Sequence, residues 1–153
     1  MKVLVEVDET LAEESVVIRC RSLDEKILQI QNVIADISKQ DKTILLHKNE
    51  KEYYLPLDQI LFFETESKEV RAHTSTEIYE TDYKLYKLEE LLPGYFMRIS
   101  KSTIVNLNHV FAISRNLTAS SLVEFANTHK KVYVSRNYYK VLVDRLAEKR
   151  RRL

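Results

Sequence analysis

The sequence predicts a strand-rich α+β protein, and two observations carry that prediction. From residue 43 onward, short apolar runs alternate with turn residues at regular intervals, which is typical of antiparallel strands. Three other stretches, 22–37, 83–92 and 137–147, have the three- and four-residue apolar spacing of amphipathic helices. We therefore expect a β-rich domain over residues 43–153, with a β-sandwich or barrel-like core, preceded by a β-β-α extension over residues 1–42.

The extension begins with two apolar runs, Val3–Val7 and Val16–Cys20, which we expect to be strands joined by an acidic loop. Ser22 is expected to begin the helix, with Glu25 completing a capping box. Five aliphatic residues then form one stripe along that helix: Leu23, Ile27, Ile30, Ile34 and Ile37. Such a stripe more often covers the helix's own small sheet, and the alternative is a dimer interface.

The β-rich part has ten strand-like runs and two helices. The expected strands are 44–46, 53–55, 60–63, 70–73, 78–79, 96–99, 104–107, 110–113, 122–125 and 132–134. Pro93 and Gly94, the latter the only glycine, should end the first of the two helices.

Composition places the chain among soluble proteins of a reducing compartment. Hydrophobic residues make up 44% of the 153 positions and charged residues 31%, as in ordinary globular domains. Cys20 is the only cysteine, which excludes an internal disulfide. No apolar run reaches the roughly 18 residues of a membrane span, and the N-terminus becomes acidic too soon for a signal peptide. We expect a cytoplasmic protein.

The net charge of +1 hides a strong asymmetry along the chain. Residues 1–94 hold 12 basic and 20 acidic residues, whereas residues 95–153 hold 12 basic and 3 acidic ones. Without the basic run 149–152, residues 95–148 still hold 8 basic against 3 acidic residues. The C-terminal part is therefore a candidate for contact with a polyanion, and a solvated basic tail explains only part of the excess.

Motifs of catalysis and metal binding are missing from the sequence. There is no G-x-S-x-G motif, and a single glycine cannot supply a glycine-rich phosphate loop. The four histidines, at 47, 73, 109 and 129, have no ligand-like spacing with one another or with Cys20. We expect no enzyme activity, no metal, no cofactor and no small-molecule substrate.

Three polar segments stand where strand-like runs end, which should place them on loops held by rigid elements. Lysine, arginine and hydroxyl groups contact phosphates, while arginine and asparagine also bond to base edges. No helix-turn-helix pattern is visible, so loops would have to contact double-stranded DNA. The candidate residues are Lys68, Ser100, Lys101, Ser102, Arg136, Asn137 and Lys140.

Five sequence blocks, in their order and spacing, resemble the LytTR DNA-binding domain. The resemblance spans residues 43–147, and the combination of the fourth block with the final Ser-Arg pair is the most specific part. The blocks are Leu57–Glu64, Val70–Thr74, Leu85–Leu92, Phe96–Asn106 and Val132–Tyr139.

The resemblance implies small antiparallel sheets with short helices, and loops inserted into successive major grooves of promoter DNA, usually by a homodimer. It assigns DNA contacts to the loops that hold Lys68, Lys101 and Arg136. Many members have His-Arg-Ser or His-Asn-Ser where this chain has Ser100–Ser102, so we expect a phosphate contact there. Arg136 matches the family best.

Residues 1–42 are too short for the phosphorylated receiver domain that many family members carry. The chain is similar to the stand-alone members, whose genes often lie beside one for a small membrane protein that restrains them. We therefore expect a sequence-specific DNA-binding transcription regulator. The alternative is a protein-interaction module that binds a membrane protein through residues 1–42 and has little DNA affinity.

Overall fold

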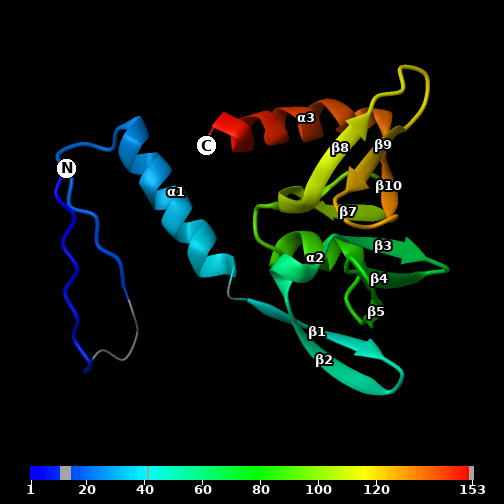
Figure 1. The fold of residues 1–153 in the computed structure, drawn as a ribbon, viewed down its shortest axis with the longest axis horizontal. Helices are drawn as coiled ribbons and strands as arrows, with labels where there is room; N and C mark the ends of the chain where they lie inside the picture. The colour runs from blue at the N-terminus through cyan, green and yellow to red at the C-terminus, as the bar shows by residue number, and fades with distance from the viewer. Residues whose placement is uncertain (11–14, 41, 152–153) are drawn as a thin grey trace.

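The computed structural model describes residues 1–10, 15–40 and 42–151. Figure 1 shows its elements in chain order. They are α1 (Glu25–Gln40), β1 (Thr43–Lys48), β2 (Lys51–Pro56), the 3-10 turn η1 (Leu57–Gln59), β3 (Phe62–Glu66), β4 (Glu69–His73), β5 (Ile78–Thr81), α2 (Leu85–Leu91), β6 (Phe96–Arg98), β7 (Thr103–Asn106), the 3-10 turn η2 (Leu107–His109), β8 (Val110–Ser114), β9 (Ser121–Phe125), β10 (Lys131–Val134) and α3 (Arg136–Arg151).

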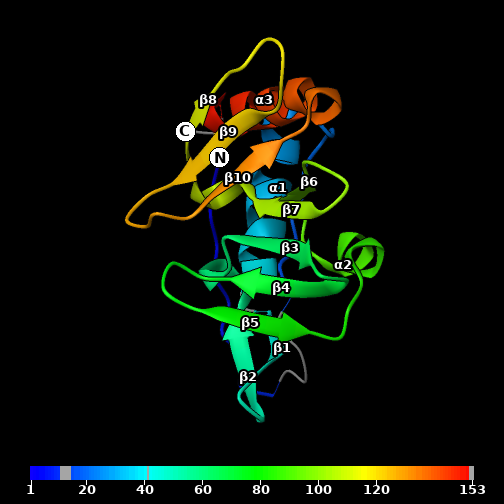
Figure 2. The same cartoon turned by 90° about the vertical axis from the view of Figure 1, so that its right-hand side faces the viewer.

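The strands form two antiparallel sheets, which confirms the predicted strand-rich α+β class. Seven strands pair in the order β2-β1-β5-β4-β3-β7-β6, and three pair in the order β10-β9-β8. Both sheets are open, so the core is not a barrel. Figure 2 shows the three-stranded sheet and α3 above β7, with β3, β4 and β5 following in turn below it.

Strands β3, β7 and β6, at one end of the larger sheet, are buried on both faces. Neighbouring residues on a strand point to opposite faces, and here each face has its own core. Phe63 and Ile104 belong to a first core under α2, which Leu85 and Leu88 complete. A second core, against the three-stranded sheet and α3, contains Phe62, Val105, Val134 and Leu142. The uninterrupted apolar run at 60–63 reflects this burial on both sides.

The two-residue turn of the β3–β4 hairpin has a conformation that its pairing requires. Glu66 is opposite Glu69, which leaves Ser67 and Lys68 as the turn residues. Both have positive φ, 50° and 71°, the signature of the type I′ turn that suits strand twist. The turn is therefore short and rigid, and Lys68 is exposed at its tip.

The extension differs from the prediction in two respects. Residues 3–7 and 16–20 lie beside each other in Figure 1 but form no strand, because an isolated two-stranded ribbon that buries no face is marginal in water. The helix begins at Glu25, and Asp24 rather than Ser22 caps it, its carboxylate accepting from the N–H of Ile27 (2.9 Å).

The helix of the extension is confirmed, and its apolar stripe lacks a sheet to cover. Neither core includes a described residue from 1–42. The division of the chain at residue 42 stays a prediction.

His73 is a buried histidine without a hydrogen-bond partner at either ring nitrogen among the described residues. Its ring stacks on Phe62, with centroids 4.2 Å apart. Burial lowers its pKa from 6.5 to about 4, with smaller contributions from the positive charges of Lys130 and Arg71. Between these two pH values the unfolded chain binds a proton that the folded chain does not.

Acid should therefore destabilise the fold through this one ring. The free energy of unfolding falls as pH drops from 6.5 towards 4, and we expect His73→Phe to remove about 2 kcal/mol of that loss at pH 4.5. Urea unfolding at pH 7 and pH 4.5 measures this. His129→Gln, at an exposed position, is the control. Equal acid sensitivity of His73→Phe and the wild type would contradict the prediction.

Candidate functional site

Two backbone hydrogen bonds bring the three predicted segments into one row. The N–H of Thr65, beside the β3–β4 turn, donates to the carbonyl oxygen of Ser102 (2.8 Å). The N–H of Ser135, just before α3, donates to the carbonyl oxygen of Ile99 (2.9 Å). The Ser100–Ser102 loop therefore lies between the β3–β4 turn and the start of α3.

Arg98 holds the Ser100–Ser102 loop from within. Its guanidinium donates to the carbonyl oxygens of Ser100 (3.0 Å) and Lys101, and to the carboxylate of Glu89 on α2. The Glu89 contact ties the loop to a helix that packs on the first core. Arg98 is half-buried and its donors are used within the protein, so it positions the loop.

The two serines shape the same loop around Lys101. The hydroxyl of Ser100 accepts from the N–H of Ser102 (3.2 Å), and the two hydroxyl oxygens are 3.4 Å apart. Both residues are half-buried, whereas Lys101 is exposed. Lys101 is therefore the group of this loop that is presented to solvent.

The first turn of α3 presents the remaining predicted residues. The carbonyl oxygen of Ser135 accepts from the N–H groups of Tyr138 and Tyr139, both at 3.0 Å. These tyrosines pack against the second core, which fixes the orientation of the turn. Arg136, Asn137 and Lys140 are all exposed, so their side chains project from a rigid backbone.

The structure adds Arg115, which the sequence analysis did not select. It lies in the loop between β8 and β9, and its guanidinium carbon is 5.1 Å from the centroid of the Tyr139 ring. Arg115 and Arg136 line the same hollow of about 160 Å³. Like the predicted segments, Ser114–Asn116 is a polar stretch directly after a strand-like run, and this signal could have identified it.

The charge of the row is uneven. At the β3–β4 turn, Lys68 lies between Glu66 and Glu69, and Glu66 pairs with Arg71 (3.0 Å). Nearby, burial and the charge of Glu66 raise the pKa of Glu64. Positive charge is therefore concentrated towards α3. We call the following exposed residues the loop surface: Lys68, Lys101, Arg115, Arg136, Asn137 and Lys140.

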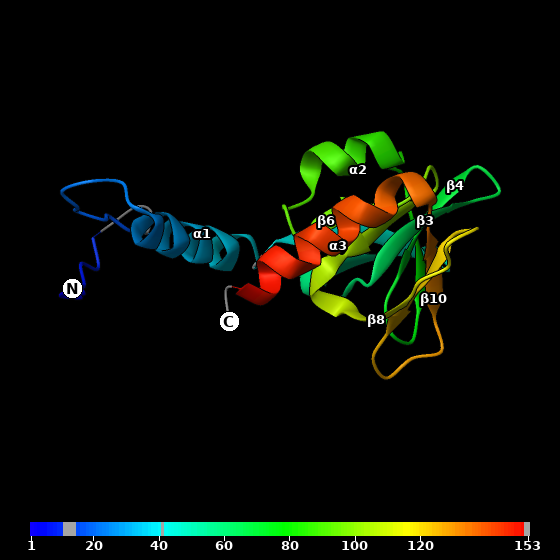
Figure 3. The same ribbon diagram turned by 90° about the horizontal axis from the view of Figure 1, so that it is seen from above.

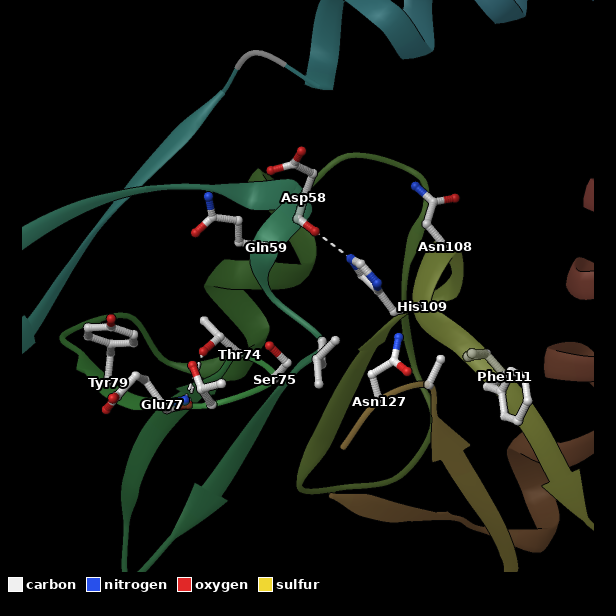
Figure 4. Close-up of a pocket in the computed structure, with 14 residues that line it drawn as sticks. Asp58, Gln59, Thr74, Ser75, Glu77, Tyr79, Asn108, His109, Phe111 and Asn127 are labelled. Carbon is white, nitrogen blue, oxygen red and sulfur yellow. Dashed lines mark hydrogen bonds between the residues drawn. The ribbon is translucent and has the colours of Figure 1, made fainter. Parts of the chain in front are cut away.

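A larger polar cleft of about 610 Å³ lies elsewhere, between the β4–β5 turn and η1 on one side and η2 with β8 on the other (Figure 4). A ring nitrogen of His109 is hydrogen-bonded to the carbonyl oxygen of Asp58 across it. The Lys130 ammonium donates to the carbonyl oxygens of Thr74 and Glu77, both at 2.8 Å. These groups join the two sheets, and none of them belongs to the loop surface.

In the part of the chain that the structure describes, no three or more histidine, cysteine or acidic side chains are grouped so as to hold a metal ion. No helix of that part is both long and apolar enough to cross a membrane.

Cations and amides on rigidly held loops are the kind of groups with which proteins contact nucleic acids. The profile of the LytTr DNA-binding domain matches residues 50–147, and the chain belongs to this family. Among solved structures, it is similar to the LytTr DNA-binding domain of a Bacillus cereus protein described as a methyl-accepting/DNA response regulator. That likeness has a TM-score of 0.62 and 25% identity, and covers 67% of this chain and 97% of the other.

Relatives of nearly the same length occur in Staphylococcus aureus. An uncharacterized HTH-type transcriptional regulator of strain NCTC 8325 is 26% identical over 147 residues, which cover 96% of this chain and 99% of the relative. A regulator of the same description from strain MSSA476 is 27% identical over 130 residues, covering 85% and 87%. In the described part of this chain, five strands separate α2 from α3, so these helices do not form a helix-turn-helix.

The clamp by Arg98 is open to a direct test. In Arg98→Ala we expect the amide hydrogen of Ser102 to exchange about tenfold faster, because roughly 1.4 kcal/mol of hydrogen bonding to the loop is lost. Amide exchange followed by NMR measures this. Lys87→Ala, which breaks an exposed ion pair with Glu90 on α2, is the control and should leave Ser102 unchanged. An unaltered rate in Arg98→Ala would show that the loop does not depend on the clamp.

Proposed function

We propose that this chain is a sequence-specific DNA-binding transcription regulator whose loop surface contacts the major groove of double-stranded DNA. The observation that carries the proposal is the row of loops that the Thr65–Ser102 and Ser135–Ile99 hydrogen bonds hold together. A row of this kind can place several cations along one backbone at once. The match to a DNA-binding family over residues 50–147 supports the same conclusion.

The roles within the loop surface follow from side-chain chemistry. Lys101 is a flexible point charge at a loop tip, and Lys140 is one turn into α3, so both suit phosphates. The N–H groups at the start of α3 add to the attraction for an anion. Ser100 and Ser102 contribute by shaping the loop that carries Lys101.

Arg136 is the residue best suited to recognise a base. It opens α3 one residue after β10, a strand with one buried face, so its planar guanidinium projects from a fixed backbone. Such a fork matches the O6 and N7 acceptors of guanine. Asn137 beside it offers an amide, which pairs in the same way with adenine. Arg115 shares the hollow of Arg136, and we expect it to contact a phosphate beside the base that Arg136 recognises.

Binding to duplex DNA should weaken steeply with salt. Each phosphate neutralised contributes about −0.9 to the slope of log affinity against log salt concentration. The five cations of the loop surface give an expected slope on the order of −3 to −6 per protomer. Fluorescence anisotropy with a duplex from the region upstream of the protein's own coding sequence measures it between 50 and about 200 mM salt. A salt-independent affinity, or no binding at low salt, would refute the proposal.

Arg136 and Lys101 should differ in what their loss does to specificity. Arg136→Ala is expected to lower affinity for the selected site by about 1–3 kcal/mol more than for scrambled DNA, since a bidentate base contact is lost. Lys101→Ala should weaken both duplexes by similar factors and make the salt slope shallower by about 1. The site is first selected from a random duplex pool, and then both affinities are measured.

Two controls accompany this comparison. Circular dichroism checks that both variants are folded, and Lys51→Ala removes an exposed cation of the β1–β2 hairpin, away from the loop surface. Equal loss of specific and scrambled binding in Arg136→Ala would mean that Arg136 contacts only the backbone. Unchanged binding by a folded Arg136→Ala would place the DNA elsewhere.

A further inference from the structure

The extension exposes more large apolar side chains than the rest of the described chain, although it is much shorter. Of the 21 large hydrophobic side chains that are exposed in the described residues, eleven come from residues 1–37. They are 46–85% exposed. In this set are Met1, Val3, Leu4, Val5, Val7, Val16, Val17, Leu23, Leu28, Val33 and Ile37.

The β-rich domain leaves this surface uncovered. Figures 1 and 3 show α1 and the preceding segments projecting away from the domain, on the side opposite the β3–β4 turn. Only the C-terminal half of α1 approaches the domain, where Val33 and Ile37 line a hollow together with Tyr95 and Arg145. The domain has its own two cores, neither of which uses the extension.

The uncovered face of α1 is hollowed and mostly apolar. Met1 lies beside Ile30, Val33 and Ile34, and these residues line a hollow of about 380 Å³. Next to α1, residues 3–7 and 16–20 are extended but belong to no strand. Their apolar side chains and extended backbone can both be covered by an added chain.

We propose that this face is a dimer interface, and that its occupant is the same extension of a second copy of this chain. A standard interface buries roughly 800 Å² per partner, and the extension offers apolar side chains that are 46–85% exposed for such burial. A two-fold arrangement lets one self-complementary patch cover itself. The Staphylococcus aureus relative matches 96% of this chain, so the match includes most of the extension.

Two α1 helices packed antiparallel, centred midway between Ile27 and Ile34, would bring the apolar hollow of one copy against that of the other. The loop surfaces of both copies stay accessible.

The test is the mass of the full-length chain in solution without DNA. We expect sedimentation equilibrium at micromolar concentrations to give about twice the 18.1 kDa of one chain. Ile30→Glu places a charge in the interface and should raise the dimer dissociation constant at least 100-fold, giving a monomer. Gln31→Glu adds the same charge at the next helix position, an exposed one, and should remain a dimer.

Circular dichroism decides whether a change in mass reflects the interface. A folded monomer for Ile30→Glu supports the proposal, whereas an unfolded one means that the stripe is core and overturns it. A wild-type monomer at all concentrations also overturns it, and leaves the surface to a different partner, such as a membrane protein. Because no DNA is present, either outcome is independent of the salt and Arg136 experiments.

Discussion

The burial of β3, β6 and β7 on both faces is the constraint on which the rest of the structure depends. Phe62 and Phe63, adjacent in sequence, enter different cores, so a shift of one residue would exchange the two cores. Because the register of these strands is fixed, the positions of their ends are fixed too. The hydrogen bond from Thr65 to Ser102 forms where β3 ends and β7 begins. The loops of the candidate site are thus positioned by the packing of the core beneath them.

The arginines and lysines of the candidate site have two roles: some hold its loops in place, and others are exposed to solvent. The guanidinium of Arg98 donates hydrogen bonds to two carbonyl groups and to Glu89. These bonds fix the geometry of the loop in the absence of DNA. Lys101 and Arg136 remain exposed. A cation held in place loses less conformational entropy on binding than one on a mobile loop. At the other end of the row, the acidic residues around Lys68 offset its charge, so that end has little net positive charge.

Much of the fold can be predicted from the local sequence pattern. The features that cannot be predicted depend on contacts between residues far apart in sequence. The strands, α2 and α3 were predictable because apolar spacing and turn residues act within a few positions. The hydrogen bonds from Thr65 to Ser102 and from Ser135 to Ile99 join residues far apart in sequence, so the row of loops could be inferred only through the family resemblance. The polar stretch after the strand-like run 110–113 could have identified Arg115, whereas its place over the Tyr139 ring is a long-range contact that the sequence does not reveal. The expected strands 3–7 and 16–20 have suitable side chains, but no strand forms there, and neither core of the described residues includes them.

The central claim is that one row of loops forms the DNA-binding face. The most direct measurement is an NMR titration of the ¹⁵N-labelled chain with a short duplex that carries the selected site. The account predicts that the largest amide shift changes fall on Lys68, Lys101, Arg115 and Arg136, while residues 1–37 and the cleft around His109 change little. Changes confined to the extension or to that cleft, with the loop surface unaffected, would contradict it.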